Sequence, residues 1–396
     1  MHHWLWYVPI TPTLEENPVK TRHAAWLLFG ALALAGCAHG PAQLASAPAA
    51  VKSLGFLGSV VITRDASALT RDLGGISGAD RDPATNTWYL LSDDRSDKAP
   101  ARFYTAAIDV NERGFKSIHI TSAVSLKRPD GSLYPAPKAG GEVADPEAIR
   151  FDPATGTLFW SSEGDRRLGL SPFVRQSTRD GAFAGEVALP ANLATHKDTE
   201  RGARNNLAIE GMAFTPSGGL WVAMEAPLYE DGPAASRMAG AVARFTRLDA
   251  NRRVTGQYAY PADAIPRDAT GGKLRSDNGV SEILAVDEDT LLVIERCGYE
   301  VAELVFQFAI RIYEVKLGAA TNIAGVDSLA GARYVPMSKR LVLDLNQAGI
   351  GSIDNIEAAA WGPRLANGNA TLILISDDNF APQQVNQFLA FEVAER

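Results

Sequence analysis

Five hairpin-like segments of related sequence occur along this chain, and such a repeat limits the fold to architectures built from equivalent units. Each segment has an apolar stretch, a turn rich in Asp, Pro, Gly or Asn, and a second apolar stretch that ends at an acidic residue. The segments are GGISGADRDPATNTWYLLSDDR, DPEAIRFDPATGTLFWSSEGDR, IEGMAFTPSGGLWVAMEAP, SEILAVDEDTLLVIERCG and IEAAAWGPRLANGNATLILISDDNF. Two β-type stretches joined by such a turn predict a β-hairpin.

The hairpins are evenly spaced along the chain. Their first stretches begin at matched positions, which are occupied by Ser77, Glu147, Glu210, Glu282 and Glu357. Successive positions lie 70, 63, 72 and 75 residues apart, and the two ends of the chain, counted from Val51, supply 65 more. A period that closes across the two ends indicates a ring of equivalent units, and the common all-β ring is a β-propeller.

Further strand candidates lie between the hairpins and bring each unit to four strands, which is the size of a propeller blade. The fifth hairpin is followed by a single clear strand, QFLAFEVA, so the N-terminal stretch LGFLGSVVIT is predicted to complete the last blade and close the ring. We therefore expect an all-β fold, a β-propeller of five four-stranded blades. The alternatives are six blades, if a long insertion hides one, and a β-sandwich whose spacing is coincidental.

The N-terminal residues have the features of a targeting segment. Basic residues precede the apolar run AAWLLFGALALAG, which is too short for a membrane span, and residues 34–37 read LAGC, as in a bacterial lipobox. Cys37 is thus predicted to be lipidated, with an ordinary secretory signal as the alternative. We also expect translation to begin near Val19, which would leave residues 1–18 untranslated.

These features divide the chain into three parts. Residues 1–37 form the signal and lipobox segment, the Ala/Pro-rich residues 38–53 a flexible tether, and residues 54–396 a single propeller domain. The predicted location is the bacterial periplasm or outer membrane, with a lipid anchor as the only membrane contact. Within the domain Cys297 is the single cysteine, so no intrachain disulfide is available.

The composition is that of a packed domain, with 46% hydrophobic and 21% charged residues. The formal net charge is −8 and no run of lysine or arginine occurs, which excludes a nucleic-acid surface or a polybasic membrane patch. We expect a monomer that uses a cation and binds a small anionic substrate.

Acidic residues recur at both ends of the hairpins. In a propeller blade the first strand lies beside the central channel and the second runs antiparallel to it, so the start of one and the end of the other share a face. The strand-start acids are Glu147, Glu210, Glu282 and Glu357, and Asp145 lies two residues before the first of them. The strand-end acids are Asp93, Glu163, Glu225, Glu295 and Asp377, extended by Asp94 and Asp378.

Carboxylates gathered in this way raise one another's pKa unless a cation neutralises them. Hard cations with flexible oxygen coordination suit such a site, Ca²⁺ first, whereas zinc fits poorly because the domain has few histidines and one cysteine. The alternative is that each acid caps a turn of its own blade.

Arginines follow several of the second strands, namely Arg95, Arg166 with Arg167, and Arg296. They would either pair with the neighbouring acids or bind an anionic group such as phosphate through bidentate hydrogen bonds. Other chemistries have little support. A serine hydrolase would have to use His196 as its base, and the chain has no Walker loop, dinucleotide fingerprint or HExxH motif.

Taken in order, the five hairpins resemble the phytase-like family described as having esterase-like activity. The motifs GGISGADRD, PEAIRFD, IEGMAF, SEILAVDEDTLLVIER and NIEAAAW carry the resemblance, which spans roughly residues 70–382. It implies an exported propeller-like protein that hydrolyses a phosphoester, by distant similarity to calcium-dependent β-propeller phytases. The third hairpin departs from the pattern, because no basic residue directly follows Glu225.

The residues and the resemblance together predict a metal-assisted phosphoester hydrolase. The predicted catalytic residues are Glu147, Glu210, Glu282 and Glu357. The predicted substrate-binding residues are Arg95, Arg166 and Arg296. The predicted Ca²⁺ ligands are Asp93, Asp94, Glu163, Glu225, Glu295, Asp377 and Asp378. The alternatives are a non-catalytic envelope propeller that binds a ligand or partner protein, and a glycan hydrolase with two opposed carboxylates.

Overall fold

The computed structural model describes residues 47, 48, 50–64, 69–266 and 275–395, all within one compact unit that spans residues 40–396. The predicted signal segment, the lipidation site at Cys37 and the translation start lie outside these residues. In the described part of the chain no helix has the length and hydropathy needed to cross a membrane.

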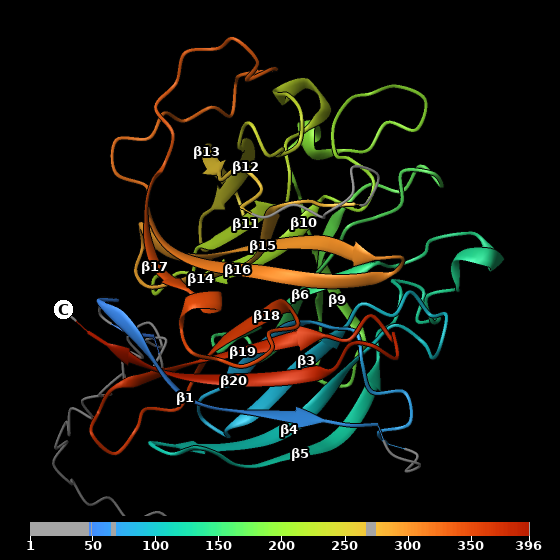
Figure 1. Cartoon of the computed structure of the whole chain (residues 1–396). Helices are drawn as coiled ribbons and strands as arrows, with labels where there is room; N and C mark the ends of the chain where they lie inside the picture. Colours follow the sequence, from blue (N-terminus) through green and yellow to red (C-terminus); the bar gives the residue numbers. More distant parts are fainter. Residues whose placement is uncertain (1–46, 49, 65–68, 267–274, 396) are drawn as a thin grey trace, which may run out of the picture. The chain divides into compact units, whose positions relative to one another are not determined.

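The described residues form five antiparallel sheets of four strands each (Figure 1). The first sheet contains β2 (Ile76–Asp82), β3 (Thr87–Ser92), β4 (Arg102–Asn111) and β5 (Gly114–Ser125). The second contains β6 (Pro146–Asp152), β7 (Thr157–Ser162), β8 (Phe173–Ser177) and β9 (Phe183–Val187). The third contains β10 (Ile209–Phe214), β11 (Leu220–Met224), β12 (Ala241–Leu248) and β13 (Val254–Ala262).

The fourth sheet contains β14 (Gly279–Ala285), β15 (Thr290–Ala302), β16 (Val305–Lys316) and β17 (Ser338–Asp344). The fifth contains β18 (Asn355–Gly362), β19 (Ala370–Asp377), β20 (Asn386–Ala394) and β1 (Ser53–Ile62). Four short 3₁₀ turns lie between strands of the described chain, namely η1 (Pro137–Ala139), η2 (Ala191–Leu193), η3 (Tyr229–Asp231) and η4 (Leu345–Gln347).

The five sheets are the blades of a propeller. The first strand of each blade, in the order β2, β6, β10, β14 and β18, packs against the first strand of the next, and β18 packs against β2. These inner strands thus line the centre of a closed ring. The predicted five-bladed propeller is confirmed, and the six-bladed and sandwich alternatives are excluded.

The ring is closed by strands from the two ends of the domain. β1 pairs antiparallel with β20, from Ser53 opposite Ala394 to Ile62 opposite Asn386. Figure 1 shows β1, in blue, beside β20, in red. The N-terminal strand therefore completes the last blade. This confirms the prediction made from the single strand that follows the fifth hairpin.

Apolar side chains between adjacent blades explain why the second strands read as unbroken apolar runs. All five residues of β11 and all eight of β19 are buried, because neighbouring sheets cover both of their faces. The core clusters accordingly join residues of successive blades, such as Leu90 and Ala358 in one and Leu292 and Leu372 in another.

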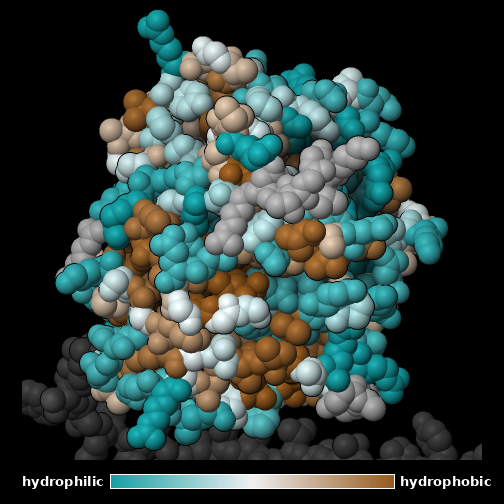
Figure 2. Space-filling model, in the orientation of Figure 1, coloured by the Kyte–Doolittle hydropathy of each residue, from teal (hydrophilic) through white to brown (hydrophobic). Residues whose placement is uncertain are grey.

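Exposed apolar side chains are scattered over the described surface. They come from several blades, for example Phe56 of β1, Val254 of β13 and Leu341 of β17. In Figure 2 the brown areas on the face drawn are interrupted by teal, hydrophilic residues. Single exposed apolar residues of this kind are usual on protein surfaces.

Candidate functional site

A β-bulge interrupts the start of every inner strand. The pairing register shifts between Ile76 and Gly78, Pro146 and Ile149, Ile209 and Gly211, Val280 and Glu282, and Ile356 and Ala358. A bulge leaves a residue out of the ladder and re-aims its side chain. The residues at the bulges are Ser77, Glu147 with Ala148, Glu210, Ser281 and Glu357.

The fourth blade therefore differs by one residue from the sequence prediction. Its bulged residue is Ser281, so Glu282 does not occupy the position of Glu147, Glu210 and Glu357. Alternate residues of a strand point to opposite faces. The shift of one residue therefore turns the side chain of Glu282 to the face opposite the one on which Glu147, Glu210 and Glu357 lie.

The ends of the second strands show the same shift. Main-chain hydrogen bonds and pairing set four acids and one arginine at equivalent positions, namely Asp93, Glu163, Glu225, Arg296 and Asp377. In the fourth blade, Glu295 pairs with Val280 and Arg296 pairs with Gly279. An arginine thus occupies the place at which each of the other blades has a carboxylate.

Two overlapping groups of buried carboxylates lie between the second and third blades. Asp145, Glu147 and Glu163 form one group, and Glu163, Glu210 and Glu225 form the other, with ligand oxygens within 4.8 Å of one another in each. We call these five residues the acidic cluster. Glu163 belongs to both groups and is therefore its central member.

Burial is the main cause of abnormal pKa values in the acidic cluster, and it raises all of them. The pKa of Asp145 rises to about 7 and that of Glu225 to about 8, although Arg95 and Arg296 respectively oppose the rise. The pKa of Glu147 lies well above its usual range because burial is reinforced by Glu210 and other acids. At neutral pH the cluster therefore needs protons or a cation.

A second set of acids lies between the fifth and first blades. Burial and then the charge of Glu357 raise the pKa of Asp93, while burial and then Asp93 raise that of Asp377. Asn355 Nδ2 donates to Glu357 Oε1 (2.9 Å) and to Asp377 Oδ2 (3.3 Å). Ser77 Oγ donates to the other oxygen of Glu357 (3.0 Å), so Glu357 is held in place from two sides.

The Gly74–Gly75 pair of the first hairpin allows these acids to approach the backbone. Gly75 has φ of +62°, and a Cβ there would lie 1.9 Å from Asp93 Oδ1. A side chain at this position would therefore displace the carboxylate.

The donor set fits a hard divalent cation. All of the close-lying ligand atoms are carboxylate oxygens, which Ca²⁺ prefers. In addition, Oδ1 of Asp93 is buried and makes no hydrogen bond. A buried carboxylate oxygen without a donor is costly, and a cation would satisfy it.

Four of the predicted site acids make other contacts instead. Glu282 pairs with Arg150 (2.6 Å), and Glu295 binds Lys339 Nζ (2.6 Å) and the hydroxyl of Tyr260 (2.6 Å). Asp378 accepts the main-chain N–H of Gly75 (3.0 Å) and pairs with Arg64.

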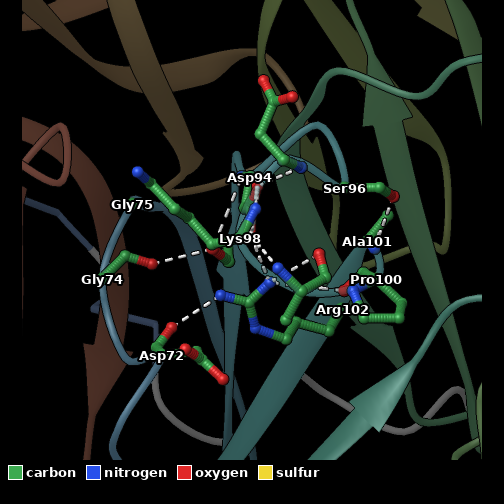
Figure 3. Close-up of polar contacts among 12 residues, drawn as sticks. Asp72, Gly74, Gly75, Asp94, Ser96, Lys98, Pro100, Ala101 and Arg102 are labelled. Atoms are coloured by element: carbon green, nitrogen blue, oxygen red, sulfur yellow. Dashed lines mark hydrogen bonds and ion pairs between the residues drawn. The ribbon is translucent and has the colours of Figure 1, made fainter. Parts of the chain in front are cut away.

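Asp94 is the fourth of these acids, and it anchors the loop that follows β3 (Figure 3). Its oxygens accept the main-chain N–H groups of Asp97 (2.8 Å), Lys98 (3.1 Å) and Ala99 (2.9 Å). Arg102 donates to it at 2.7 Å, and both side chains of this pair are buried. These four acids make the turn-capping and pairing contacts of the alternative prediction.

Replacing Asp94 with Asn is expected to lower the free energy of unfolding by about 3 kcal/mol, because it leaves the buried charge of Arg102 without its partner. Calcium stoichiometry should not change. The exposed neighbour Asp97 supplies the control, since Asp97→Asn should alter neither quantity. Urea unfolding and calcium calorimetry measure the two effects. An Asp94→Asn protein that kept its stability and lost a calcium ion would place Asp94 among the ligands.

Arg150 links the inner strands of four blades. Its guanidinium donates to the carbonyl oxygens of Met212 (2.6 Å), Ala79 (2.7 Å) and Ile283 (3.0 Å), which belong to three other inner strands. Together with Glu282 it forms a buried ion pair across the ring. This role cannot be read from the sequence, because no neighbour of the arginine in PEAIRFD reveals it.

The predicted substrate-binding arginines have different surroundings. Arg95 pairs with Asp165 (2.6 Å) and approaches Asp145 (3.5 Å), so it lies beside the acidic cluster. Arg166 donates to the carbonyl of Thr199 (2.9 Å) and stacks over Tyr229. Arg166 is partly buried.

Arg296 forms ion pairs with acids of two neighbouring blades. Its Nη2 lies 3.1 Å from Glu225 Oε1, and its Nε lies 3.5 Å from Glu357 Oε1. Arg296 thus lies among the carboxylates, between the two sets of acids.

The sequence profile of the phytase-like family, described as "Esterase-like activity of phytase", matches residues 71–380. No curated protein matches the chain by sequence.

Three solved structures are similar to the chain in outline. A member of the DUF4221 family from Bacteroides vulgatus is 8% identical, with a TM-score of 0.39 over 88% of this chain and 99% of the other. A protein from Parabacteroides distasonis described as a glycoside hydrolase is 10% identical, with a TM-score of 0.38 over 88% and 92%. The α-L-arabinanase of Cellvibrio cellulosa is 14% identical, with a TM-score of 0.36 over 77% and 87%.

Proposed function

Since the chain belongs to the phytase-like family, we propose that it hydrolyses a phosphoester with the help of a divalent cation, Ca²⁺ first, held by the acidic cluster. The observation that carries the proposal is the pair of overlapping carboxylate groups that share Glu163. Their oxygens are buried, they belong to two adjacent blades, and their raised pKa values show that burial and mutual repulsion disfavour the charged forms, which a bound cation would neutralise.

Bound Ca²⁺ would supply Lewis-acid polarisation of a phosphoryl oxygen and would lower the pKa of a bound water. The five residues of the acidic cluster would hold the ion. Of the predicted catalytic acids, Glu147 and Glu210 belong to this cluster and would therefore act as ligands.

Two of the predicted catalytic acids, Glu282 and Glu357, belong to neither carboxylate group, and Glu282 is paired with Arg150. Ser77 and Asn355 fix the two oxygens of Glu357, whose side chain is 12% exposed. A fixed, partly exposed carboxylate close to Glu210 and Glu225 is suited to accept a proton from an attacking water. We assign this role to Glu357.

Arg95 and Arg166 would bind the substrate phosphate. Arg95 lies 3.5 Å from Asp145, so its guanidinium is next to the cation site and would reach an oxygen of the same phosphate. Arg166 lies three residues after Glu163 and would extend the positive edge toward the rim. The proposed location is the bacterial envelope, with the lipid anchor at Cys37.

The proposal is tested with a panel of phosphomonoesters and phosphodiesters, assayed with Ca²⁺ and with a chelator. We expect turnover of at least one phosphoester with Ca²⁺ and none with the chelator. Calorimetry on the same preparation measures ion binding. Calcium binding without turnover of any phosphoester would contradict the proposal and support a non-catalytic ligand-binding propeller. Turnover of glycosides alone would support the glycan alternative.

A further inference from the structure

Arg296 replaces a carboxylate at one position of an otherwise acidic ring. The equivalent residues in the other blades are Asp93, Glu163, Glu225 and Asp377, and the pairing of Arg296 with Gly279 fixes the comparison. The fourth blade also has Ser281 where three other blades have glutamates at the bulge. At these two positions the fourth blade thus contributes a positive charge and no carboxylate, although its Asp277 lies close enough to raise the pKa of Arg296.

The contacts of Arg296 join the two blades on either side of its own. Its guanidinium pairs with Glu225, which follows the third blade's β11, and with Glu357 of the fifth blade's β18. Its side chain is only 15% exposed. Gly279 helps to direct Glu225 toward it, because a Cβ at Gly279 would lie 2.6 Å from Glu225 Cγ.

Arg296 remains protonated and positively charged in these surroundings. Burial lowers its pKa, but Glu357, Asp277, Glu225 and Glu210 together raise it above its ordinary value. A guanidinium therefore stays protonated at every pH at which the protein is folded. Its Nε is buried and makes no hydrogen bond, so the side chain is held by charge more than by a full set of hydrogen bonds.

We propose that Arg296 is a resident cation, which occupies the space between Glu225 and Glu357 and excludes a divalent ion from it. Divalent ions are then confined to the acidic cluster, in which an oxygen of Glu225 lies within 4.8 Å of oxygens of Glu163 and Glu210. The inference rests on the proposed function in that it assumes a calcium site at the cluster.

Two consequences follow from a fixed charge at this point. The half of the face between the third and fifth blades is neutralised by the polypeptide itself, so it depends less on metal for its folding. The site also becomes asymmetric, with metal on one side and Glu357, paired with Arg296, on the other. Without the arginine, Glu225 and Glu357 would lose their shared ion-pair partner, and a hard cation would be the natural replacement.

The test counts calcium ions per chain by native mass spectrometry in Arg296→Gln, in Arg296→Lys and in the unaltered protein. Arg296→Gln is expected to hold one additional ion, since the neutral amide leaves room and negative charge. Arg296→Lys keeps the charge and should hold the unaltered number. The double variant R296Q/E357Q removes a ligand of the new site and should lose the additional ion.

An Arg296→Gln protein with the unaltered number of ions would overturn the inference, and so would an additional ion in Arg296→Lys. If Arg296→Gln folds only when calcium is present, the ion has replaced the arginine and the inference holds; if it folds in neither condition, the lysine variant still decides. Failure of the proposed function looks different. The unaltered protein would then bind no calcium or turn over no phosphoester, whatever the count in the variants.

Discussion

Replacing Glu163 with Gln is expected to weaken calcium binding and to lower metal-dependent turnover by about 100-fold or more. Loss of a residue that only supports a ligand costs 10- to 100-fold, and Glu163 is a shared member of both carboxylate groups. The fold should survive, because Glu163 accepts the main-chain N–H of Ala208 and the amide oxygen of Gln is also an acceptor. Without metal, the variant should be more stable than the unaltered protein, because it lacks a buried carboxyl group whose pKa is raised by burial and by neighbouring acids.

Glu295→Gln is the matched control. Glu295 is also a buried glutamate near the end of a second strand, but it binds Lys339 and Tyr260 away from the acidic cluster. Its replacement should reduce stability and leave calcium affinity unchanged. Calorimetry and steady-state kinetics separate the two variants. Equal calcium affinity in Glu163→Gln and the unaltered protein would remove the cluster from the proposed function.

The ring could be predicted from the sequence because its evidence is local and repeated. Each hairpin has its own turn and its own apolar stretches, and the period identifies the number of blades. The N-terminal strand was predictable for a similar reason, since the fifth blade lacked a fourth strand and the segment before the first hairpin could supply it. Such patterns do not depend on knowing which side chains meet.

The fourth blade shows where the sequence pattern fails. Both VSE and IER contain an acid one residue away from the structurally equivalent position, so alignment on the nearest acid selects Glu282 and Glu295. The register instead selects Ser281 and Arg296. A shift of one residue reverses the side of the strand on which a side chain lies, and only the bulge determines it.

The sequence pattern also treats the two acids of each Asp–Asp pair alike, whereas the structure separates them. In Asp93–Asp94 and Asp377–Asp378 the first acid faces the site, whereas the second turns away and binds main-chain N–H groups. Consecutive residues cannot both point in one direction from an extended backbone. Arg150 could not be found at all, since its partners are carbonyl oxygens that meet only when the ring closes.

The stability of the metal-free protein is expected to fall as the pH rises from about 4 to about 8. In the folded protein burial raises the pKa of Asp145 from 3.8 to about 7 and that of Glu225 from 4.5 to about 8. Below the unfolded pKa values both states are protonated, so the full stability is present. Above them the unfolded chain releases its protons first, and stability is lost until the pH passes the folded pKa values. The expected slope is about 1.4 kcal/mol per pH unit for each such carboxyl.

Calcium should remove this loss, because the ion neutralises the carboxylates that repel one another at high pH. Urea unfolding at pH 5, 6, 7 and 8, in EDTA and in Ca²⁺, measures both profiles. Glu163→Gln in EDTA should show a shallower slope than the unaltered protein, since it lacks one member of the acidic cluster. Because the carboxyls interact, the loss belongs to the cluster and not to one residue. A metal-free profile that stayed level between pH 5 and 8 would mean that the carboxylates are neutralised by the polypeptide alone, with Arg296 and Arg95 sufficient as counter-ions.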